Sequence, residues 1–284
     1  MSLPARLRPI LPTVLKGMAG LLFAALTACQ DVASGQFEGA ETHLDPRIDE
    51  ASGLAASIRQ PGLYWAHNDS RAFFDSQPTE PLFYAIDAQG QVQGELWVDG
   101  LKPYDWEAIS AFRWKDRSYL VIGDVGDNRA RRGRGVRLDV VEEPQKITGQ
   151  MTRKPAWTLR LSYADGPRDA EAMAVDGKEK AVYILTKRDV PARLYRAPLL
   201  PGKGGTARLD YLGEIVPLDA PLTTGMPSEL KVLPFTHQPT DMAFAPDGSE
   251  VAVLTYAHLY VFARKPGQSW LDALRGTPRV IDLP

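Results

Sequence analysis

Short apolar runs alternate with polar turn signals along most of this chain. The runs are rich in β-branched and aromatic residues, which favour strands; examples are LYWAHND (63–69), YLVIGD (119–124), AVYILTK (181–187) and EVAVLTY (250–256). Turn-forming stretches such as DAQGQ (87–91) separate them. One segment, SWLDALRG (269–276), predicts a short helix, with Ser269 as the N-cap and Gly276 just beyond its end. The pattern therefore predicts an all-β fold.

The predicted strands are grouped in a module that recurs four times. The modules begin at Glu50, Asp105, Asp169 and Thr240. Each has an acidic residue near its start, then a strand of small residues, a polar turn and a strongly apolar second strand that ends in polar residues. Two further strands follow. The repeat period is about 60–70 residues, since Glu107 and Glu171 stand 64 positions apart.

A four-stranded antiparallel unit that repeats at this period is typical of a β-propeller blade. Small residues suit the first strand of a blade because that strand lines the crowded central axis. We therefore expect residues 43–284 to form a β-propeller of four-stranded antiparallel blades, with four modules visible in this chain. Related chains could have five or more blades. The alternative fold is a β-sandwich, in which the similarity of the modules would be coincidental.

The N-terminal segment predicts export rather than folding. Basic residues precede the apolar run MAGLLFAALTA (18–28), which is too short to span a membrane permanently. The sequence LTAC (26–29) resembles a bacterial lipobox, in which the cysteine is lipidated and becomes the mature N-terminus. We expect a lipoprotein signal peptide over 1–28, lipidation at Cys29 and a polar tether over 29–42. The alternative is ordinary signal cleavage that leaves a free thiol.

This segment also predicts where the protein acts. A lipidated Cys29 would make the membrane its first partner and place the protein in the cell envelope. By resemblance to lipoprotein sorting, Gln30 after the cysteine favours the periplasmic face of the outer membrane.

Charge and cysteine content exclude several function classes. The chain has 284 residues and a net charge of −2 at pH 7, which argues against a general nucleic-acid binder. Cys29 is the one cysteine, so the sequence holds neither a disulfide framework nor a cysteine metal site. The four histidines lack the spacing of zinc ligands.

Polar residues gather where the first strand of a module starts and its second strand ends. Because the two strands are antiparallel, both points lie on the same face of the propeller. In the second module, Asp105 and Glu107 should therefore meet the sequence GDVGDN (123–128). The corresponding groups elsewhere are Glu50 with His67, Asn68 and Asp69, Asp169 and Glu171 with Lys187 and Arg188, and Asp241 with Tyr256 and His258.

The second and third modules follow the common sequence pattern closely, and the first and fourth follow it only approximately. Aligning AMAVDG (172–177) with AFAPDG (243–248) places Met242 opposite Glu171, so the acid of the fourth module is displaced. Aligning the first module on Gly53 and Leu54 places Glu50 opposite Asp105.

The stretch GDVGDN does not fit two common loop types. A phosphate-binding loop leads into a helix, whereas this stretch leads through RARRGRG (129–135) back into a predicted strand. An EF-hand needs a 12-residue loop that ends in Glu. Carboxylate and amide ligands for a hard cation, supplied by several loops, remain possible, and calcium takes six to eight oxygens.

We therefore expect a calcium site at the channel mouth, and assign each polar residue a role. The candidate metal ligands are Asp69, Asp105, Asp124, Asp127, Asn128 and Asp169. The candidate catalytic residues are Glu107, Glu171 and Lys187, and the candidate ligand-binding residues are His67, Asn68, Arg129 and Tyr256. The alternative for any one acid is structural, since Asp and Asn commonly hold tight turns and cap backbone N–H groups.

Five arginines follow the second strand of the second module, at 129, 131, 132, 134 and 137. They could steer an anionic ligand or surface toward this face. A solvated loop with scattered charge is the simpler interpretation.

Two function classes stay open. The sequence holds no G-x-S-x-G elbow, so a serine hydrolase is not supported. In a metal-dependent hydrolase of phosphate esters or lactones, Glu107 or Glu171 would be the base and Lys187 would stabilise developing charge. Propellers also serve as binding platforms without chemistry. We favour a module that binds a small molecule or a protein.

Several stretches together resemble a group of secreted or anchored bacterial β-propeller proteins of poorly defined function. They are SGL (52–54), WAHNDS (65–70), DWEAI (105–109), GDVGDNRARR (123–132), RDAEAM (168–173) and LTKRD (185–189). More remotely, the chain resembles phytase-like, SdiA-regulated and gluconolactonase-type propellers, the last with a central divalent metal. The resemblance implies a propeller and calcium. It implies no reaction, because the catalytic residues of those families cannot be matched here position by position.

Overall fold

The computed structural model describes residues 44–69, 80–133, 135–222 and 235–283. The predicted signal peptide, Cys29, the tether and Arg134 lie outside these residues, as does the boundary of the propeller domain at 43. None of the helices in the described part is long and apolar enough to cross a membrane.

The described chain is built almost wholly of strands, in four antiparallel modules. Module 1 contains β1 (Ala51–Ala56), β2 (Tyr64–Asn68), β3 (Leu82–Ile86) and β4 (Val92–Val98). Module 2 contains β5 (Trp106–Trp114), β6 (Arg117–Asp124), β7 (Val136–Glu142) and β9 (Pro155–Tyr163). Module 3 contains β10 (Ala170–Asp176), β11 (Ala181–Thr186), β12 (Arg193–Pro198) and β13 (Thr206–Glu214). Module 4 contains β14 (Pro239–Phe244), β15 (Glu250–Thr255), β16 (His258–Ala263) and β17 (Arg279–Asp282).

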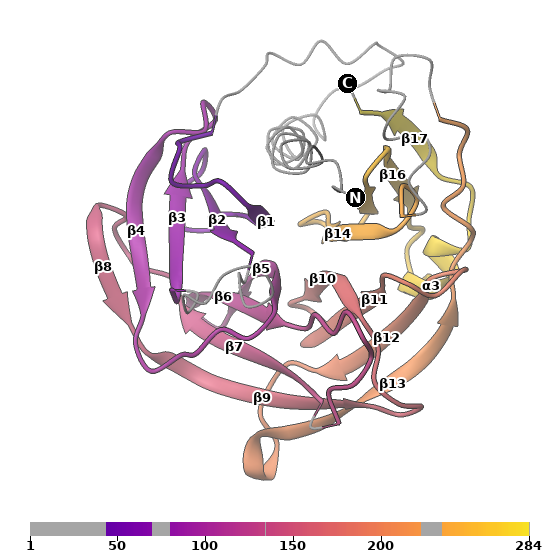
Figure 1. Ribbon diagram of the computed structural model, residues 1–284, viewed down its shortest axis with the longest axis horizontal. Helices are drawn as coiled ribbons and strands as arrows, with labels where there is room; N and C mark the ends of the chain where they lie inside the picture. Colours follow the sequence, from indigo (N-terminus) through magenta and orange to yellow (C-terminus); the bar gives the residue numbers. More distant parts are fainter. Residues whose placement is uncertain (1–43, 70–79, 134, 223–234, 284) are drawn as a thin grey trace, which may run out of the picture.

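The modules are arranged around a common centre as propeller blades (Figure 1). The first strand of each module lies innermost: β5 packs beside β1 and β10, and β10 packs beside β14. The later strands lie toward the periphery. The predicted all-β class and propeller architecture are therefore confirmed.

Two parallel pairings depart from the expected four-strand blades. β8 (Gly149–Arg153) adds to the outer edge of module 1 by pairing in parallel with β4. β9 pairs in parallel with β13, so that modules 2 and 3 form one eight-stranded sheet. Both pairings cover strand edges that would otherwise expose unpaired backbone groups. Pairings between modules of this kind leave no local signal in the sequence.

Each inner hairpin contains one register shift, and the shift falls at the same place in every module. The first and second strands lose register between Ala51 and Gly53 in module 1 and between Pro239 and Asp241 in module 4. The same shift occurs in the two middle modules. A β-bulge of this kind inserts one extra residue and redirects its side chain. The inserted residues are Ser52, Glu107, Glu171 and Thr240.

This register corrects one sequence alignment and supports another. Thr240, not Met242, is the structural equivalent of Glu171. The alignment failed because the Asp-Gly pair lies two positions farther from the bulge in module 4 (Asp247 and Gly248) than in module 3 (Asp176 and Gly177), although the two hairpins are equally long. Glu50 does correspond to Asp105, since each stands two positions before a bulge residue.

Hydrophobic clusters fill the spaces between neighbouring modules. One takes its residues from modules 2 and 3, another from modules 3 and 4, and a third from modules 1 and 2. A further cluster takes residues from modules 1 and 4. Burial of these faces stabilises the arrangement because each apolar contact is removed from water.

The predicted helix is present as α3 (Trp270–Leu274). Ser269 is its N-cap, and the Ser269 hydroxyl accepts a hydrogen bond from the Asp272 backbone N–H at 3.0 Å. The ring of Trp270 stacks on Phe244 with centroids 3.8 Å apart, and its Nε1 donates to Asp176 at 2.9 Å. Trp270 thereby joins module 4 to module 3.

We expect Trp270→Ala to lower the free energy of unfolding by about 3–5 kcal/mol, because it removes a fully buried ring. Trp270→Phe keeps a ring against Phe244 but leaves Asp176 without its indole donor, so a loss of about 1–3 kcal/mol is expected. Urea unfolding followed by circular dichroism would measure both. A loss below about 1 kcal/mol for Trp270→Ala would contradict the bridging role.

Candidate functional site

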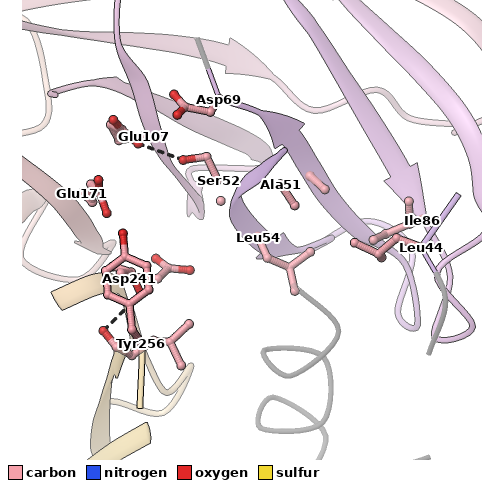
Figure 2. Close-up of a pocket in the computed structure, with 14 residues that line it drawn as sticks. Leu44, Ala51, Ser52, Leu54, Asp69, Ile86, Glu107, Glu171, Asp241 and Tyr256 are labelled. Atoms are coloured by element: carbon pink, nitrogen blue, oxygen red, sulfur yellow. Dashed lines mark hydrogen bonds between the residues drawn. The ribbon is translucent and has the colours of Figure 1, made fainter. Parts of the chain in front are cut away.

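The four bulge residues line one cavity of about 110 Å³ at the centre of the molecule. Figure 2 shows Ser52, Glu107 and Glu171 pointing toward it from the inner strands. Asp69, Asp241 and Tyr256 complete its polar wall, and the opposite wall is apolar, with Leu44 and Ile86. Glu107 accepts a hydrogen bond from the Ser52 hydroxyl at 2.9 Å.

A second layer of side chains comes from the residues just after the second strands. Asp69 and Lys187 occupy equivalent places, since the N–H of Asp69 donates to the Glu50 carbonyl at 2.7 Å and that of Lys187 to the Asp169 carbonyl at 2.9 Å. In module 2 the equivalent donor is Gly126, at 3.2 Å from the Asp105 carbonyl.

Gly126 lets its loop approach the acidic residues closely. A Cβ at this position would lie 2.5 Å from Cγ of Asp105 and 2.9 Å from Cγ of Glu107. Real Cβ atoms do not make such contacts, so a larger residue would push the loop away from the carboxylates. The second glycine of GDVGDN is therefore explained by packing rather than by phosphate binding.

Three carboxylates form a compact cluster beside the cavity. One oxygen each from Asp69, Asp105 and Glu107 lies within 4.8 Å of the others. Asp105 and Glu107 are only 3% and 4% exposed. Burial, followed by the charge of Asp169, raises the pKa of Asp105 to about 7. Burial and then the charge of Glu171 raise the pKa of Glu107 well above its ordinary value. The cluster therefore favours a bound proton or a bound cation.

Lys187 is a buried cationic side chain that contacts two lining residues of the cavity without lining it itself. Lys187 Nζ donates to Glu171 and, at 3.1 Å, to the Tyr256 hydroxyl. Burial opposes the charged form of Lys187, but the charge of Glu171 outweighs it and raises the pKa of Lys187 above its ordinary value. Burial also raises the pKa of Tyr256 to about 12. Lys187 thus stays protonated and Tyr256 keeps its hydroxyl proton near neutral pH.

Asp241 is a further buried acid on the cavity wall. Burial raises its pKa well above the ordinary value. Its carboxylate accepts the Met242 backbone N–H at 2.7 Å. The sequence places Asp241 at the mouth but gives it no role, and it gives no indication of Ser52 or Thr240, which only the bulge register identifies.

Asp124 and Asp127 hold the loop after β6. Asp124 forms ion pairs with Arg132 at 2.8 Å and Arg137 at 3.0 Å, and it accepts the Asp105 N–H at 3.2 Å. Asp127 accepts the backbone N–H groups of Arg131 at 2.9 Å and Arg132 at 2.7 Å. Neither carboxylate belongs to the three-carboxylate cluster.

Asp169 and Asn128 meet at Arg188. Asp169 pairs with Arg188 Nε at 2.6 Å and accepts the Asp127 N–H at 2.8 Å. The Asn128 side-chain oxygen accepts a hydrogen bond from the same guanidinium. These contacts fix Asp169 in place. Its charge in turn raises the pKa of Asp105.

Of the four predicted ligand-binding residues, one lines the cavity and three do not. Tyr256 lines the cavity. His67 is fully buried between Phe83 and Trp106, and burial lowers its pKa to about 4. The Asn68 side chain donates to the Arg47 carbonyl at 2.8 Å, and Arg129 is exposed on the loop. None of these last three is among the described residues that line the cavity.

The sequence matches no family model, and no curated protein sequence is significantly similar to it. Solved structures with a similar fold include hydrazine synthase from Kuenenia stuttgartiensis, with 12% identity, 88% of this chain and 61% of that chain covered, and a TM-score of 0.38. Another is a gluconolactonase from Xanthomonas campestris, with 12% identity, 84% and 63% coverage and a TM-score of 0.42. A third is a functionally unknown protein from Desulfotomaculum acetoxidans, with 11% identity, 81% and 55% coverage and a TM-score of 0.40.

The chain therefore spans 55–63% of the length of these three structures. At such low identities and TM-scores they carry no argument about the site or its chemistry.

The pKa of Asp105 predicts how stability depends on pH in the absence of divalent cations. A carboxyl with a pKa raised to about 7 binds its proton more tightly in the folded than in the unfolded chain. The contribution of Asp105 to stability should therefore fall as pH rises from about 4 to 7, by roughly 1–3 kcal/mol.

Urea unfolding at several pH values in chelating buffer, compared between the wild type and Asp105→Asn, would isolate this contribution. As pH rises, the free energy of unfolding should fall less in the variant than in the wild type. Identical pH profiles for the two proteins would show that Asp105 titrates normally.

Proposed function

We propose that this protein is a binding module that holds a divalent cation, calcium, at the mouth of its channel and takes a small-molecule or protein ligand there. The observation that carries the proposal is the cluster of Asp69, Asp105 and Glu107, whose oxygens lie within 4.8 Å of one another beside the cavity. Carboxylate oxygens are the ligands that calcium prefers.

The residues present fit such a cation. Asp105 and Glu107 are buried, and their like charges repel each other and Asp69. A divalent cation would offset this repulsion without a proton. Three carboxylates supply three to six of the six to eight oxygens that calcium takes, and water or a ligand would supply the rest.

The cavity supports a ligand beside the cation. Asp69 and Glu107 face it, so a ligand oxygen could reach a cation held there. The apolar wall, which includes Leu54 and Leu254, would accept a nonpolar part of the same ligand. The preferred ligand thus combines an oxygen donor with an apolar group.

The proposal includes the location that the N-terminal sequence predicts. A lipid anchor at Cys29 would hold the module in the cell envelope, at the periplasmic face of the outer membrane. Calcium is available there, outside the cytoplasm.

A second candidate function is metal-dependent hydrolysis of a phosphate ester or a lactone. The observation that favours it is Lys187, which does not line the cavity itself but is held protonated against Glu171 and Tyr256, which do. A bound cation would polarise a phosphoryl or carbonyl oxygen and activate water. Lys187 would stabilise negative charge that develops on the substrate oxygen, and Glu171, which lies outside the three-carboxylate cluster, would accept a proton as the base.

The cation site predicts calcium-dependent stability. Calcium at about 100–1,000 times its dissociation constant should stabilise the full chain by roughly 3–4 kcal/mol, measured as a rise in the thermal midpoint over the same protein in chelator. Asp105→Asn should lose most of this rise. Asp116→Asn, which changes an exposed acid in the turn between β5 and β6, is the matched control and should keep it. If calcium leaves the wild-type midpoint unchanged, the cation site is wrong.

The hydrolase candidate predicts turnover by the calcium-loaded protein. We expect release of p-nitrophenol from its phosphate ester, or opening of a sugar lactone, with a loss of about 10²-fold or more in kcat for Lys187→Gln. Calcium-dependent stabilisation measured on the same variant would separate lost chemistry from lost cation binding. Calcium binding without turnover of either substrate class would leave the binding module as the function.

A further inference from the structure

A second pocket, of about 500 Å³, is lined by four arginines and lies against module 2. We call it the arginine pocket, and its charged residues are Arg131, Arg132, Arg137 and Arg160, with Asp124 beneath them. Tyr104, from the segment before β5, forms one side. The loop after β6 and the strands β7 and β9 form the rest.

Strand register brings two of the arginines side by side. Arg137 on β7 is directly opposite Asp124 on β6 and Arg160 on β9. Directly opposed residues share a face of the sheet, and like charges in this arrangement destabilise it. Arg137 is balanced by Asp124 at 3.0 Å and Asp139 at 2.7 Å. Within the described residues, the guanidinium of Arg160 has no ion pair or hydrogen bond of its own.

The remaining two arginines come from the loop after β6. Arg132 is fixed by hydrogen bonds from its Nη1 to Asp124 at 2.8 Å and to the Gly126 carbonyl at 2.9 Å. Its guanidinium carbon lies 4.8 Å from the centre of the Tyr104 ring. In the described part of the chain, the backbone N–H of Arg131 is bound by Asp127 but its guanidinium has no acidic partner. Four guanidinium groups therefore face two carboxylates, those of Asp124 and Asp139.

This excess of positive charge identifies the chemistry of a ligand. Guanidinium groups bind phosphate and carboxylate oxygens through paired N–H donors, and several of them together favour a doubly charged anion. Tyr104 is 57% exposed, and its ring offers a flat surface beside the charges. We propose that the arginine pocket binds a phosphate monoester group, carried by a soluble phosphate ester or by a lipid headgroup.

The proposed phosphate site can be tested separately from the cation site. Arg132 and Arg137 hold Asp124, and Asp124 in turn accepts the Asp105 N–H, so substitutions there would disturb both sites. Arg131 and Arg160 are exposed and have no described contact with the carboxylate cluster. The double variant Arg131→Gln/Arg160→Gln therefore removes charge from the pocket alone.

The first experiment measures thermal unfolding of the full chain with inorganic phosphate and with sodium chloride at equal ionic strength, both free of divalent cations. Phosphate should raise the wild-type midpoint, and the double variant should lose the rise. Arg113→Gln, which removes an exposed arginine from β5 outside the pocket, is the matched control and should keep it. The midpoint in chloride alone reports whether each variant folds normally.

A second arm distinguishes the two sources of the phosphate. Vesicles of phosphatidylcholine with phosphatidic acid, a monoester, are compared by sedimentation with vesicles that contain phosphatidylglycerol, a diester of equal sign. A preference for phosphatidic acid that the double variant loses would support a lipid source, and a rise with inorganic phosphate alone would support a soluble ester. The proposal is overturned if neither probe acts, or if the double variant and Arg113→Gln respond equally.

Discussion

A β-bulge at the start of every inner strand is the constraint from which the site follows. In a regular strand, alternate side chains face opposite sides, so few residues could point toward the channel. The bulge adds one residue to each inner strand and directs it inward. Repetition around the centre then brings Ser52, Glu107, Glu171 and Thr240 to one cavity. A repeated backbone irregularity thus builds a site of mixed chemistry, because modules 2 and 3 supply glutamates and modules 1 and 4 supply hydroxyl side chains.

Several acidic side chains are buried close together around the cavity, and they differ in whether a basic side chain compensates their charge. Asp124 and Asp169 are each neutralised by arginines from nearby loops, and Glu171 by Lys187. Asp105 and Glu107 lie among these acids and stay buried, and their pKa values rise in consequence. Removal of a carboxylate from water is costly unless a partner compensates. Among the described residues, neither Asp105 nor Glu107 forms an ion pair, so the cation that we propose would compensate their charge.

Asp124 connects the acidic cavity to the arginine pocket. Its carboxylate accepts the Asp105 N–H on one side and pairs with Arg132 and Arg137 on the other. Module 2 thus presents surfaces of opposite charge around one buried residue. The loop after β6 can lie so close to both because Gly126 has no side chain to displace Asp105 and Glu107.

The sequence alone determined the four modules with their inner antiparallel hairpins, the short helix, and the gathering at one face of Asp105, Glu107, Glu171, Lys187 and Tyr256. These features follow from local alternation and from antiparallel pairing of neighbouring strands. Only the tertiary structure decided which acids share the cavity, because the bulge that directs one residue of each inner strand inward has no local signal, and the Asp-Gly pairs of modules 3 and 4 lie at different distances from it. It also decided that His67 is a core residue and that Asp127 holds a turn, since burial and hydrogen-bond partners depend on strands distant in the sequence.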